Sequence, residues 1–217
     1  MRVKANNVDL YYETYGSGPP LLMLHGNSED CHIFDKLASK LRAHFTLYLL
    51  DSRCQGLSEK TAEFSYDLMA ADTREFIREL KIAPVNLVGF SDGGILGLLL
   101  AREDQSLLRK MAVLGANLRP EDLTEEGVAF VQRLHDTGKY PLLGIALKEP
   151  NIDPASLKGV KTPTLVVAGE NDIVKPEVTQ EIAASLADAR TLILPGRDHL
   201  SYVVDQDELY EPLVAFF

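Results

Sequence analysis

The strongest constraint on the fold is an alternation of short apolar runs with stretches of helical spacing. The five stretches of helical spacing are Ile33–Leu41, Leu68–Leu80, Gly94–Arg102, Glu177–Leu186 and Leu209–Phe217. The runs that suit strands are Leu10–Tyr15, Leu21–Leu24, Phe45–Leu50, Val85–Val88, Met111–Leu114, Thr164–Ala168 and Thr191–Leu194. Because strands that are covered by helices on both faces are apolar throughout, this pattern predicts a mostly parallel α/β sheet with right-handed crossovers.

Residues 118–161 interrupt the alternation, since they are far more than one crossover helix needs. Thr124 suits the N-cap of a helix that ends near Thr137, and Pro141–Leu147 suits a second short helix. We expect a small helical cap inside a single domain of residues 1–217, and a peripheral hairpin on the sheet edge is the alternative. Several apolar residues of this segment could line a pocket or pack on the sheet: Val128, Phe130, Val131, Leu134, Tyr140 and Leu143.

Composition and charge exclude several classes of function. The 217 residues are 46% hydrophobic, and the formal net charge of -10 contains no basic stripe that could bind nucleic acid or an anionic membrane. Two cysteines are too few for a disulfide framework or a four-ligand zinc site. The N-terminus lacks the apolar core of a signal peptide, and no apolar stretch is long enough for a membrane span. We therefore expect a cytoplasmic protein with no nucleic-acid or membrane partner.

The pentapeptide Gly89-Phe90-Ser91-Asp92-Gly93 lies between an apolar run and a helical stretch. It matches the G-x-S-x-G nucleophile elbow in the strand–turn–helix context that this motif requires. A tight turn would project the Ser91 hydroxyl above the sheet, and glycine at both flanking positions would avoid collisions with backbone. The start of a helix would also direct free N–H groups towards a developing oxyanion. An ordinary glycine-rich turn is the structural alternative.

A serine hydroxyl is a weak nucleophile at neutral pH, so it needs a base and a carboxylate that orients the base. Asp172 follows one late apolar run and His199 follows the next, both in loops at the carboxyl ends of predicted strands. We predict that Ser91 is the nucleophile, His199 the general base and Asp172 the orienting acid. Glu170 is an alternative acid, whereas Asp198 is expected to face solvent.

Two further motifs complete a resemblance to the α/β-hydrolase superfamily over essentially the whole chain. They are Leu24-His25-Gly26-Asn27 and Asp51-Ser52-Arg53-Cys54-Gln55-Gly56-Leu57-Ser58. The chain order Ser, Asp, His is also that of the family. The resemblance implies an α/β-hydrolase fold and an oxyanion hole made by the backbone N–H groups of Asn27 and Asp92, with His25 shaping the loop. The family usually has glycine where Cys54 stands, and we expect this thiol to be inert.

The elbow is similar to that of valacyclovir hydrolase-like enzymes and of related serine aminopeptidases and esterases. This resemblance implies a serine hydrolase, carboxylesterase or aminopeptidase-like, that cleaves a small ester or amide through an acyl-enzyme on Ser91 without a cofactor. The carboxylate of Asp92 either attracts a cationic substrate group or points away to backbone or solvent. The same triad could also serve an acyltransferase, a perhydrolase or a ligand-binding receptor of low turnover.

Two other sequence patterns predict neither a dinucleotide-binding site nor a metal site. Gly16-Ser17-Gly18 leads into a strand and lacks a third glycine, so a dinucleotide is not expected. His25, Cys31 and His32 have nearer explanations and no supporting carboxylate spacing, so no metal is expected. The expected partner is therefore a small-molecule substrate, with no cofactor and no metal.

Overall fold

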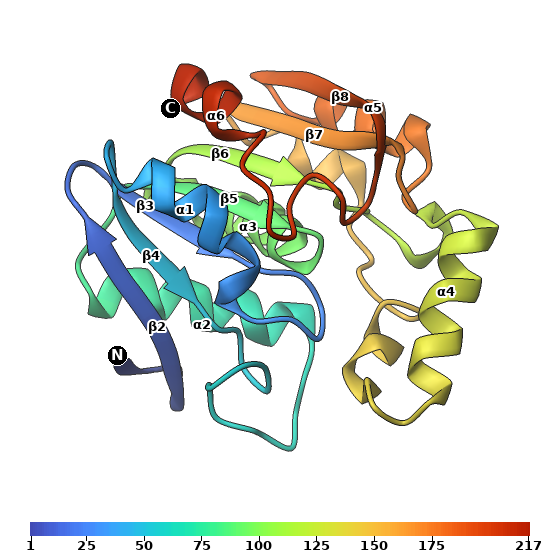
Figure 1. Cartoon of the computed structure of the whole chain (residues 1–217), viewed down its shortest axis with the longest axis horizontal. Helices are drawn as coiled ribbons and strands as arrows, with labels where there is room; N and C mark the ends of the chain where they lie inside the picture. Colours follow the sequence, from blue (N-terminus) through green and yellow to red (C-terminus); the bar gives the residue numbers. More distant parts are fainter.

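The computed structural model describes all 217 residues and contains one eight-stranded sheet between two layers of helices (Figure 1). The sheet order is β1-β2-β4-β3-β5-β6-β7-β8, in which β1 pairs antiparallel with β2, β2 pairs antiparallel with β4, and all other pairs are parallel. The predicted mostly parallel sheet is thus confirmed. The strands are β1 (Arg2–Ala5), β2 (Val8–Gly16), β3 (Pro20–Leu24), β4 (Thr46–Leu50), β5 (Val85–Phe90), β6 (Leu108–Leu114), β7 (Thr164–Asn171) and β8 (Ala189–Asp198).

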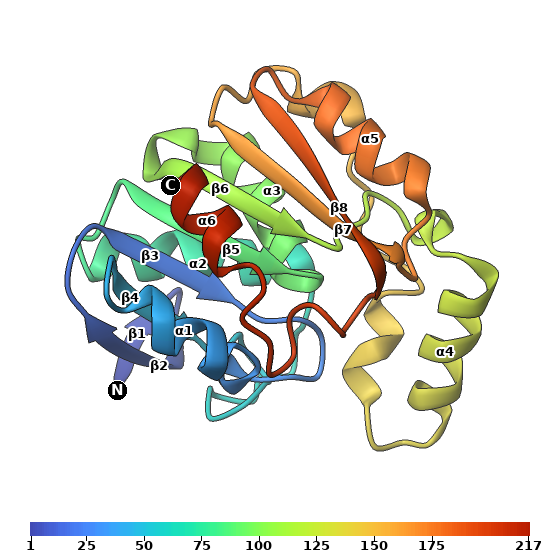
Figure 2. The same cartoon turned by 45° about the horizontal axis from the view of Figure 1, so that its top comes forward.

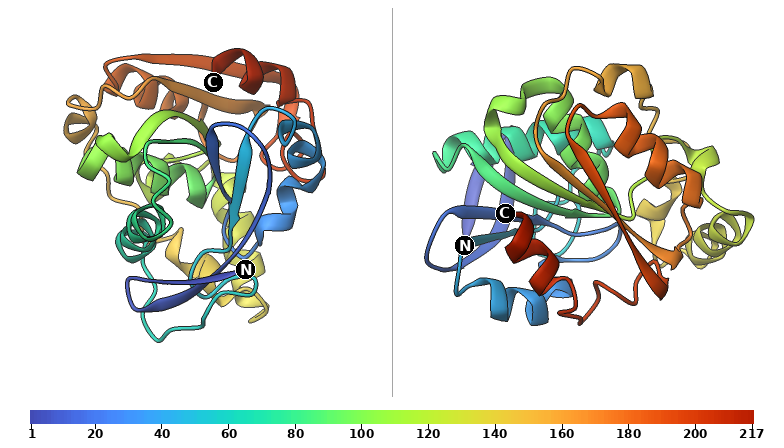
Figure 3. Two further views of the ribbon diagram at one scale, coloured as in Figure 1. Left: turned by 90° about the vertical axis from the view of Figure 1, so that its left-hand side faces the viewer. Right: turned by 90° about the horizontal axis from the view of Figure 1, so that it is seen from above.

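The helices divide between the two faces of the sheet, as Figure 3 shows. One face carries α2 (Tyr66–Glu79), α3 (Asp92–Asp104) and α5 (Pro176–Ser185), and the other carries α1 (Asp35–Leu41) and α6 (Tyr210–Phe216). Alternate residues of a strand enter different cores: Leu22 and Leu24 of β3 pack beneath the first group, and Leu21 and Met23 beneath the second. This is why the central strands are apolar at every position.

Three elements differ from the sequence prediction. Strand β1 was not expected, because its polar and apolar residues alternate and most of it is exposed. Strand β8 continues beyond the predicted end at Leu194, because pairing with β7 extends to Asn171 and Asp198. The predicted helix Ile33–Leu41 is split into a 3-10 turn, η1 (Cys31–Phe34), and α1.

Residues 118–161 connect β6 to β7 and contain the helix α4 (Glu125–Asp136). The hydroxyl of Thr124 accepts a hydrogen bond from the Gly127 N–H at 3.0 Å, so this residue caps α4 as its sequence context predicted. The second expected helix is the 3-10 turn η4 (Pro141–Ile145). Two further turns are η3 (Pro120–Asp122) and η5 (Pro154–Leu157).

The helix α4 lies beyond the carboxyl ends of the central strands (Figure 2). A backbone bridge between Leu123 and Val174 fastens the start of this segment to the loop that follows β7. The Thr124 N–H also donates to the carbonyl of Ile173 at 2.8 Å. The segment therefore sits above the edge of the sheet at which a parallel α/β fold places its ligands. None of the helices has both the length and the apolarity needed to cross a bilayer.

Candidate active site

Ser91 occupies a sharp turn between β5 and α3. Its φ of 51° and ψ of -113° lie outside the regions that residues with a side chain usually adopt. The Ser91 N–H donates to the carbonyl of Leu114 at 2.7 Å, which ties the turn to β6. A Cβ atom at Gly89 would collide with the Gly93 carbonyl, and one at Gly93 would collide with the Leu24 carbonyl. The two glycines of the motif are therefore required by close backbone contacts on both sides of the serine.

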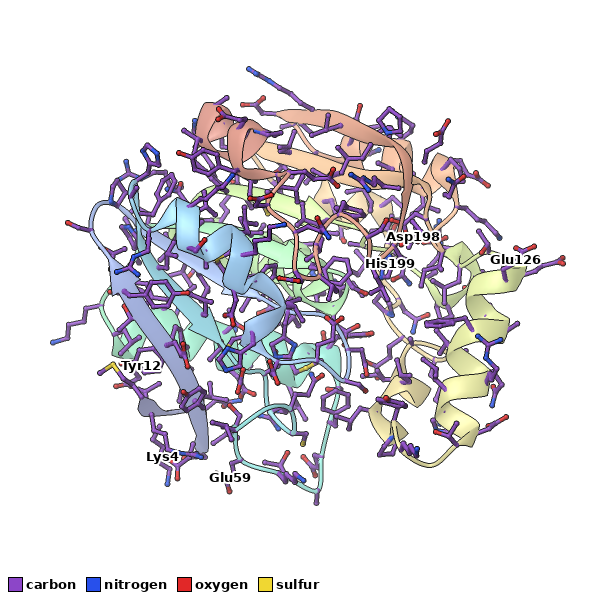
Figure 4. The ribbon with its side chains drawn as sticks, viewed as in Figure 1. Lys4, Tyr12, Glu59, Glu126, Asp198 and His199 are labelled. Carbon is purple, nitrogen blue, oxygen red and sulfur yellow. The ribbon has the colours of Figure 1, made fainter.

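Of the three predicted triad residues, His199 lies within hydrogen-bond distance of both Ser91 and Asp172. The His199 Nε2 atom is 3.1 Å from the Ser91 Oγ atom, and the His199 Nδ1 atom is 2.6 Å from the Asp172 Oδ1 atom. Figure 4 shows His199 at the end of β8, on the side of the sheet that faces α4. Because the carboxylate requires a proton on Nδ1, the Nε2 atom is left with a lone pair directed at the serine hydroxyl.

The carboxylate of Asp172 is fixed by backbone donors. It accepts hydrogen bonds from the Val174 N–H at 3.2 Å and the Gly169 N–H at 3.3 Å. Burial alone would raise the pKa of Asp172, but the charge and hydrogen bond of His199 and the backbone N–H donors lower it below its usual value. Burial also opposes protonation of His199, yet the Asp172 carboxylate raises the pKa of this histidine above its ordinary value. The Asp172 carboxylate thus stabilises the imidazolium that forms when His199 Nε2 takes up a proton.

The alternative acids turn away from the imidazole. Glu170 accepts a hydrogen bond from the Gly196 N–H at 2.7 Å. Asp198 is exposed, and its Oδ1 atom accepts from the N–H groups of Leu200 at 3.0 Å and Ser201 at 2.9 Å. Glu170 therefore bonds the backbone of β8, Asp198 caps the turn that follows it, and neither bonds His199.

The two predicted oxyanion-hole donors lie on loops that are joined to each other. Asp92 is the first residue of α3, so its N–H has no intrahelical partner, and the Asn27 N–H donates no hydrogen bond. The Gly93 N–H donates to the His25 carbonyl at 3.1 Å, which couples the two loops. The buried His25 ring bonds the Gly26 carbonyl through Nδ1 at 2.7 Å and accepts from the Ser52 N–H through Nε2 at 3.0 Å. Both ring nitrogens are therefore used within the protein, as expected for a residue that shapes the loop.

The Asp51–Ser58 motif forms a second supporting loop. Asp51 accepts hydrogen bonds from the backbone N–H groups of Cys31 at 2.8 Å and Leu57 at 2.7 Å. Cys54 has a φ of 65°, the left-handed conformation for which the family's usual glycine is suited. Its sulfur accepts a hydrogen bond from the Thr61 N–H at 3.3 Å. The cysteine thus retains the turn that a glycine would form.

A cavity of about 330 Å³ lies above Ser91 and is bounded by both the sheet and residues 118–161. Five of the six predicted pocket residues line it, whereas Val128 does not and is 40% exposed. The size suits a small molecule. Its apolar wall from residues 118–161 consists of Leu123, Phe130, Val131, Leu134, Tyr140, Leu143 and Ala146.

Two carboxyl groups, Asp92 and Glu29, face this cavity, and its lining contains no lysine or arginine. Asp92 accepts hydrogen bonds from the Tyr66 hydroxyl at 2.8 Å and the Asn27 side-chain amide at 2.9 Å, so it does not point away to backbone or solvent. Burial raises the pKa of Asp92 to about 6. Glu29 accepts from the Gly26 N–H at 3.0 Å, and burial raises its pKa to about 7.

Sequence reasoning missed Glu29 and Tyr66. Glu29 stands two residues after Asn27 in the predicted oxyanion loop, and this proximity was a usable signal. Tyr66 begins α2, and no motif in the sequence places it beside the elbow.

Glu29→Gln is expected to increase stability at alkaline pH but not in mild acid. The fold raises the pKa of Glu29 from 4.5 to about 7, so its stabilising contribution is present below pH 4.5 and is lost as the pH rises through 7. Glutamine retains an oxygen for the Gly26 N–H and carries no charge. The free energy of unfolding should exceed that of the wild type by about 2–3 kcal/mol at pH 8.5, with little difference at pH 4.5.

Urea unfolding at the two pH values measures this effect. Glu170→Gln, at an exposed glutamate, is the matched control. Its free energy of unfolding should differ from that of the wild type by the same small amount at both pH values. A Glu29→Gln difference that is equal at pH 4.5 and 8.5 would contradict the interpretation.

Comparison with known proteins places the chain in a family. A family model described as the alpha/beta hydrolase fold matches residues 19–141. The mouse serine hydrolase BPHL is 28% identical over 242 residues, covering 95% of this chain and 82% of that protein. The pimeloyl-acyl-carrier-protein methyl ester esterase of Nitrosospira multiformis is 24% identical over 96% of this chain and 98% of its own length.

Solved structures share the fold. The enol-lactonase of Burkholderia xenovorans superposes with a TM-score of 0.84 at 21% identity, covering all of this chain and 99% of that one. This agrees with the observed strand order and with the position of the elbow between β5 and α3. The fold class inferred from the sequence is confirmed, and the chain belongs to the alpha/beta hydrolase fold family.

Proposed function

We propose that this hydrolase cleaves a small ester or amide through an acyl-enzyme on Ser91. The observation that carries the proposal is the continuous chain of contacts from the Ser91 hydroxyl through His199 to Asp172, with Ser91 and His199 lining the cavity. The mouse relative is named a serine hydrolase and the Nitrosospira relative a methyl ester esterase, which supports the same chemistry here.

In the first step, the Ser91 Oγ atom attacks the substrate carbonyl and His199 Nε2 takes the hydroxyl proton. The oxyanion is stabilised by the backbone N–H groups of Asn27 and Asp92, each worth about 3 kcal/mol. His199 then gives its proton to the leaving alcohol or amine as the carbon–oxygen or carbon–nitrogen bond breaks. In the second step, water attacks the acyl carbon while His199 takes a proton from the water. The bond from the acyl carbon to Ser91 Oγ then breaks, and His199 returns the proton to Ser91.

The cavity favours a neutral or cationic substrate. Its walls are mainly apolar, and its only ionisable groups besides His199 and two tyrosines are the carboxyls of Asp92 and Glu29. An anionic acyl group would be repelled there, whereas an ammonium group could bind beside the nucleophile at Asp92. Residues 118–161 act in this proposal as a cap within one domain of residues 1–217, because they supply the apolar roof.

Hydrolysis of paired p-nitrophenyl esters and aminoacyl amides tests the proposal. Each aminoacyl compound is compared with the analogue in which hydrogen replaces the amino group. Turnover of at least one class is expected, with kcat/KM about 10-fold or more in favour of the amino compound, and Asp92→Asn should remove that preference.

The outcomes separate the two parts of the proposal. Turnover without preference would reject the role of the Asp92 carboxylate and leave the hydrolase intact. Transfer of the acyl group to an added alcohol without hydrolysis would show that the protein is an acyltransferase and not a hydrolase.

A further inference from the structure

Three side chains of different ligand chemistry meet outside the active-site cavity. They are the carboxylate of Glu13 on β2 and the thiol and imidazole of Cys31 and His32 in η1. One ligand atom from each lies within 4.8 Å of the other two. None of the three lines the cavity above Ser91.

The imidazole of His32 is already oriented for a ligand role. Its Nδ1 atom is 3.2 Å from each carboxylate oxygen of Asp35, and its Nε2 atom is 3.9 Å from the Glu13 Oε1 atom. With the Nδ1 proton donated to Asp35, the Nε2 atom on the Glu13 side keeps a lone pair for a metal ion. A carboxylate behind a histidine is the usual support of a metal-bound imidazole.

The Glu13 carboxylate is supported in the same way. The Tyr11 hydroxyl donates to the Glu13 Oε1 atom at 2.9 Å, so this oxygen has a fixed position while the other is free. The Cys31 N–H is held by Asp51 at 2.8 Å, which sets the position of the thiol. Cys31 is buried, but Glu13 is half-buried and His32 is exposed, so an ion would enter from their side.

We propose that Glu13, Cys31 and His32 bind Zn²⁺. Zinc accepts sulfur, nitrogen and oxygen ligands together in a tetrahedral arrangement, and a water molecule would fill the fourth position. Binding converts the Cys31 thiol to a thiolate and releases its proton to solvent. The dication also compensates the acidic surroundings formed by Glu13 and Asp35. No spacing in the sequence pairs Glu13 with Cys31 and His32, because the fold alone brings β2 beside η1.

Titration of the purified protein with Co²⁺ tests the site. A thiolate-to-cobalt charge-transfer band is expected in the near ultraviolet, together with the strong visible bands of tetrahedral cobalt, and added Zn²⁺ should remove both. His32→Ala should weaken Co²⁺ binding at least about 10-fold. Asp35→Asn should weaken it about 10-fold, because the carboxylate that orients the His32 ring is lost. Cys31→Ser should abolish the charge-transfer band.

Matched controls remove the competing explanations. His44→Ala changes an exposed histidine elsewhere, Cys54→Ser removes the other thiol, and His199→Ala removes the active-site imidazole; all three should bind Co²⁺ as the wild type does. His32 is exposed, so its variant remains informative even if the Cys31 variant fails to fold. Absence of the charge-transfer band, unchanged affinity in His32→Ala, or loss of the band in Cys54→Ser would overturn the proposal.

Discussion

Ser91→Ala is expected to lower kcat by about six orders of magnitude, because no other group can form the acyl-enzyme and His199 is left without a proton to accept. The serine sits alone at the apex of the elbow, and its Oγ atom is the one that contacts the His199 Nε2 atom. Steady-state hydrolysis of the best p-nitrophenyl ester measures kcat. A fluorophosphonate probe and mass spectrometry identify the labelled residue.

Ser28→Ala is the matched control for this experiment. Ser28 also lines the cavity, but its hydroxyl donates to the Asn27 side-chain oxygen at 2.8 Å and does not contact the histidine. The fluorophosphonate probe should still label Ser91 in the Ser28 variant, and the kcat of this variant should stay within about 10-fold of the wild-type value. Labelling of the Ser91 variant at wild-type rate, with Ser28 as the modified residue, would show that the nucleophile was assigned to the wrong serine.

The double variant Ser91→Ala with His199→Ala adds a second criterion. Because the two groups act as one unit, removing both should cost about as much as removing the serine alone. A further large loss in the double variant would mean that His199 acts on the substrate independently of Ser91.

The positions of the three proposed triad residues could be predicted from sequence because each lies just beyond a strand. Ser91 follows β5, Asp172 follows β7 and His199 follows β8. Parallel strands bring their carboxyl ends to one edge of the sheet, whatever contacts their side chains make. The prediction therefore required only the strand assignments and the chain order. Its boundaries were less accurate at β8, where pairing with β7 lengthens the strand by four residues beyond Leu194.

Features that depend on packing between distant segments could not be predicted. The Tyr66 hydroxyl reaches Asp92 because α2 packs beside α3, and nothing in the sequence around Tyr66 records that contact. Glu13 approaches His32 because β2 inserts beside β4, an antiparallel pairing outside the predicted parallel core. Cys54 is an intermediate case, since the family pattern indicated a turn and the positive φ explains why glycine is usual there.

Asp172→Asn is expected to reduce kcat about four orders of magnitude, or about 5 kcal/mol, with little change in the fold. The carboxylate fixes the proton on His199 Nδ1 and stabilises the imidazolium, and an amide does neither reliably. Donors surround both oxygens, the Val174 N–H at Oδ1 and the Gly169 N–H at Oδ2, so either orientation of the amide places an NH₂ group against an N–H. The loss of charge should also lower the pKa of His199, because Asp172 raises it. The remaining activity should thus persist to lower pH than in the wild type.

The pH profile of kcat/KM distinguishes this positioning role from a general loss of structure, which would not move the acid limb. Glu170→Gln and Asp198→Asn are the matched controls. Both carboxylates lie near Asp172 or His199 in sequence, but Glu170 accepts from the Gly196 N–H and Asp198 from the Leu200 N–H. Each should retain kcat within about 10-fold and keep the acid limb in place. If Glu170→Gln lowers kcat as much as Asp172→Asn does, Glu170 would be the residue that orients His199. An Asp172→Asn variant with wild-type kcat would remove Asp172 from the catalytic unit, because the only charge that contacts His199 Nδ1 would then be dispensable.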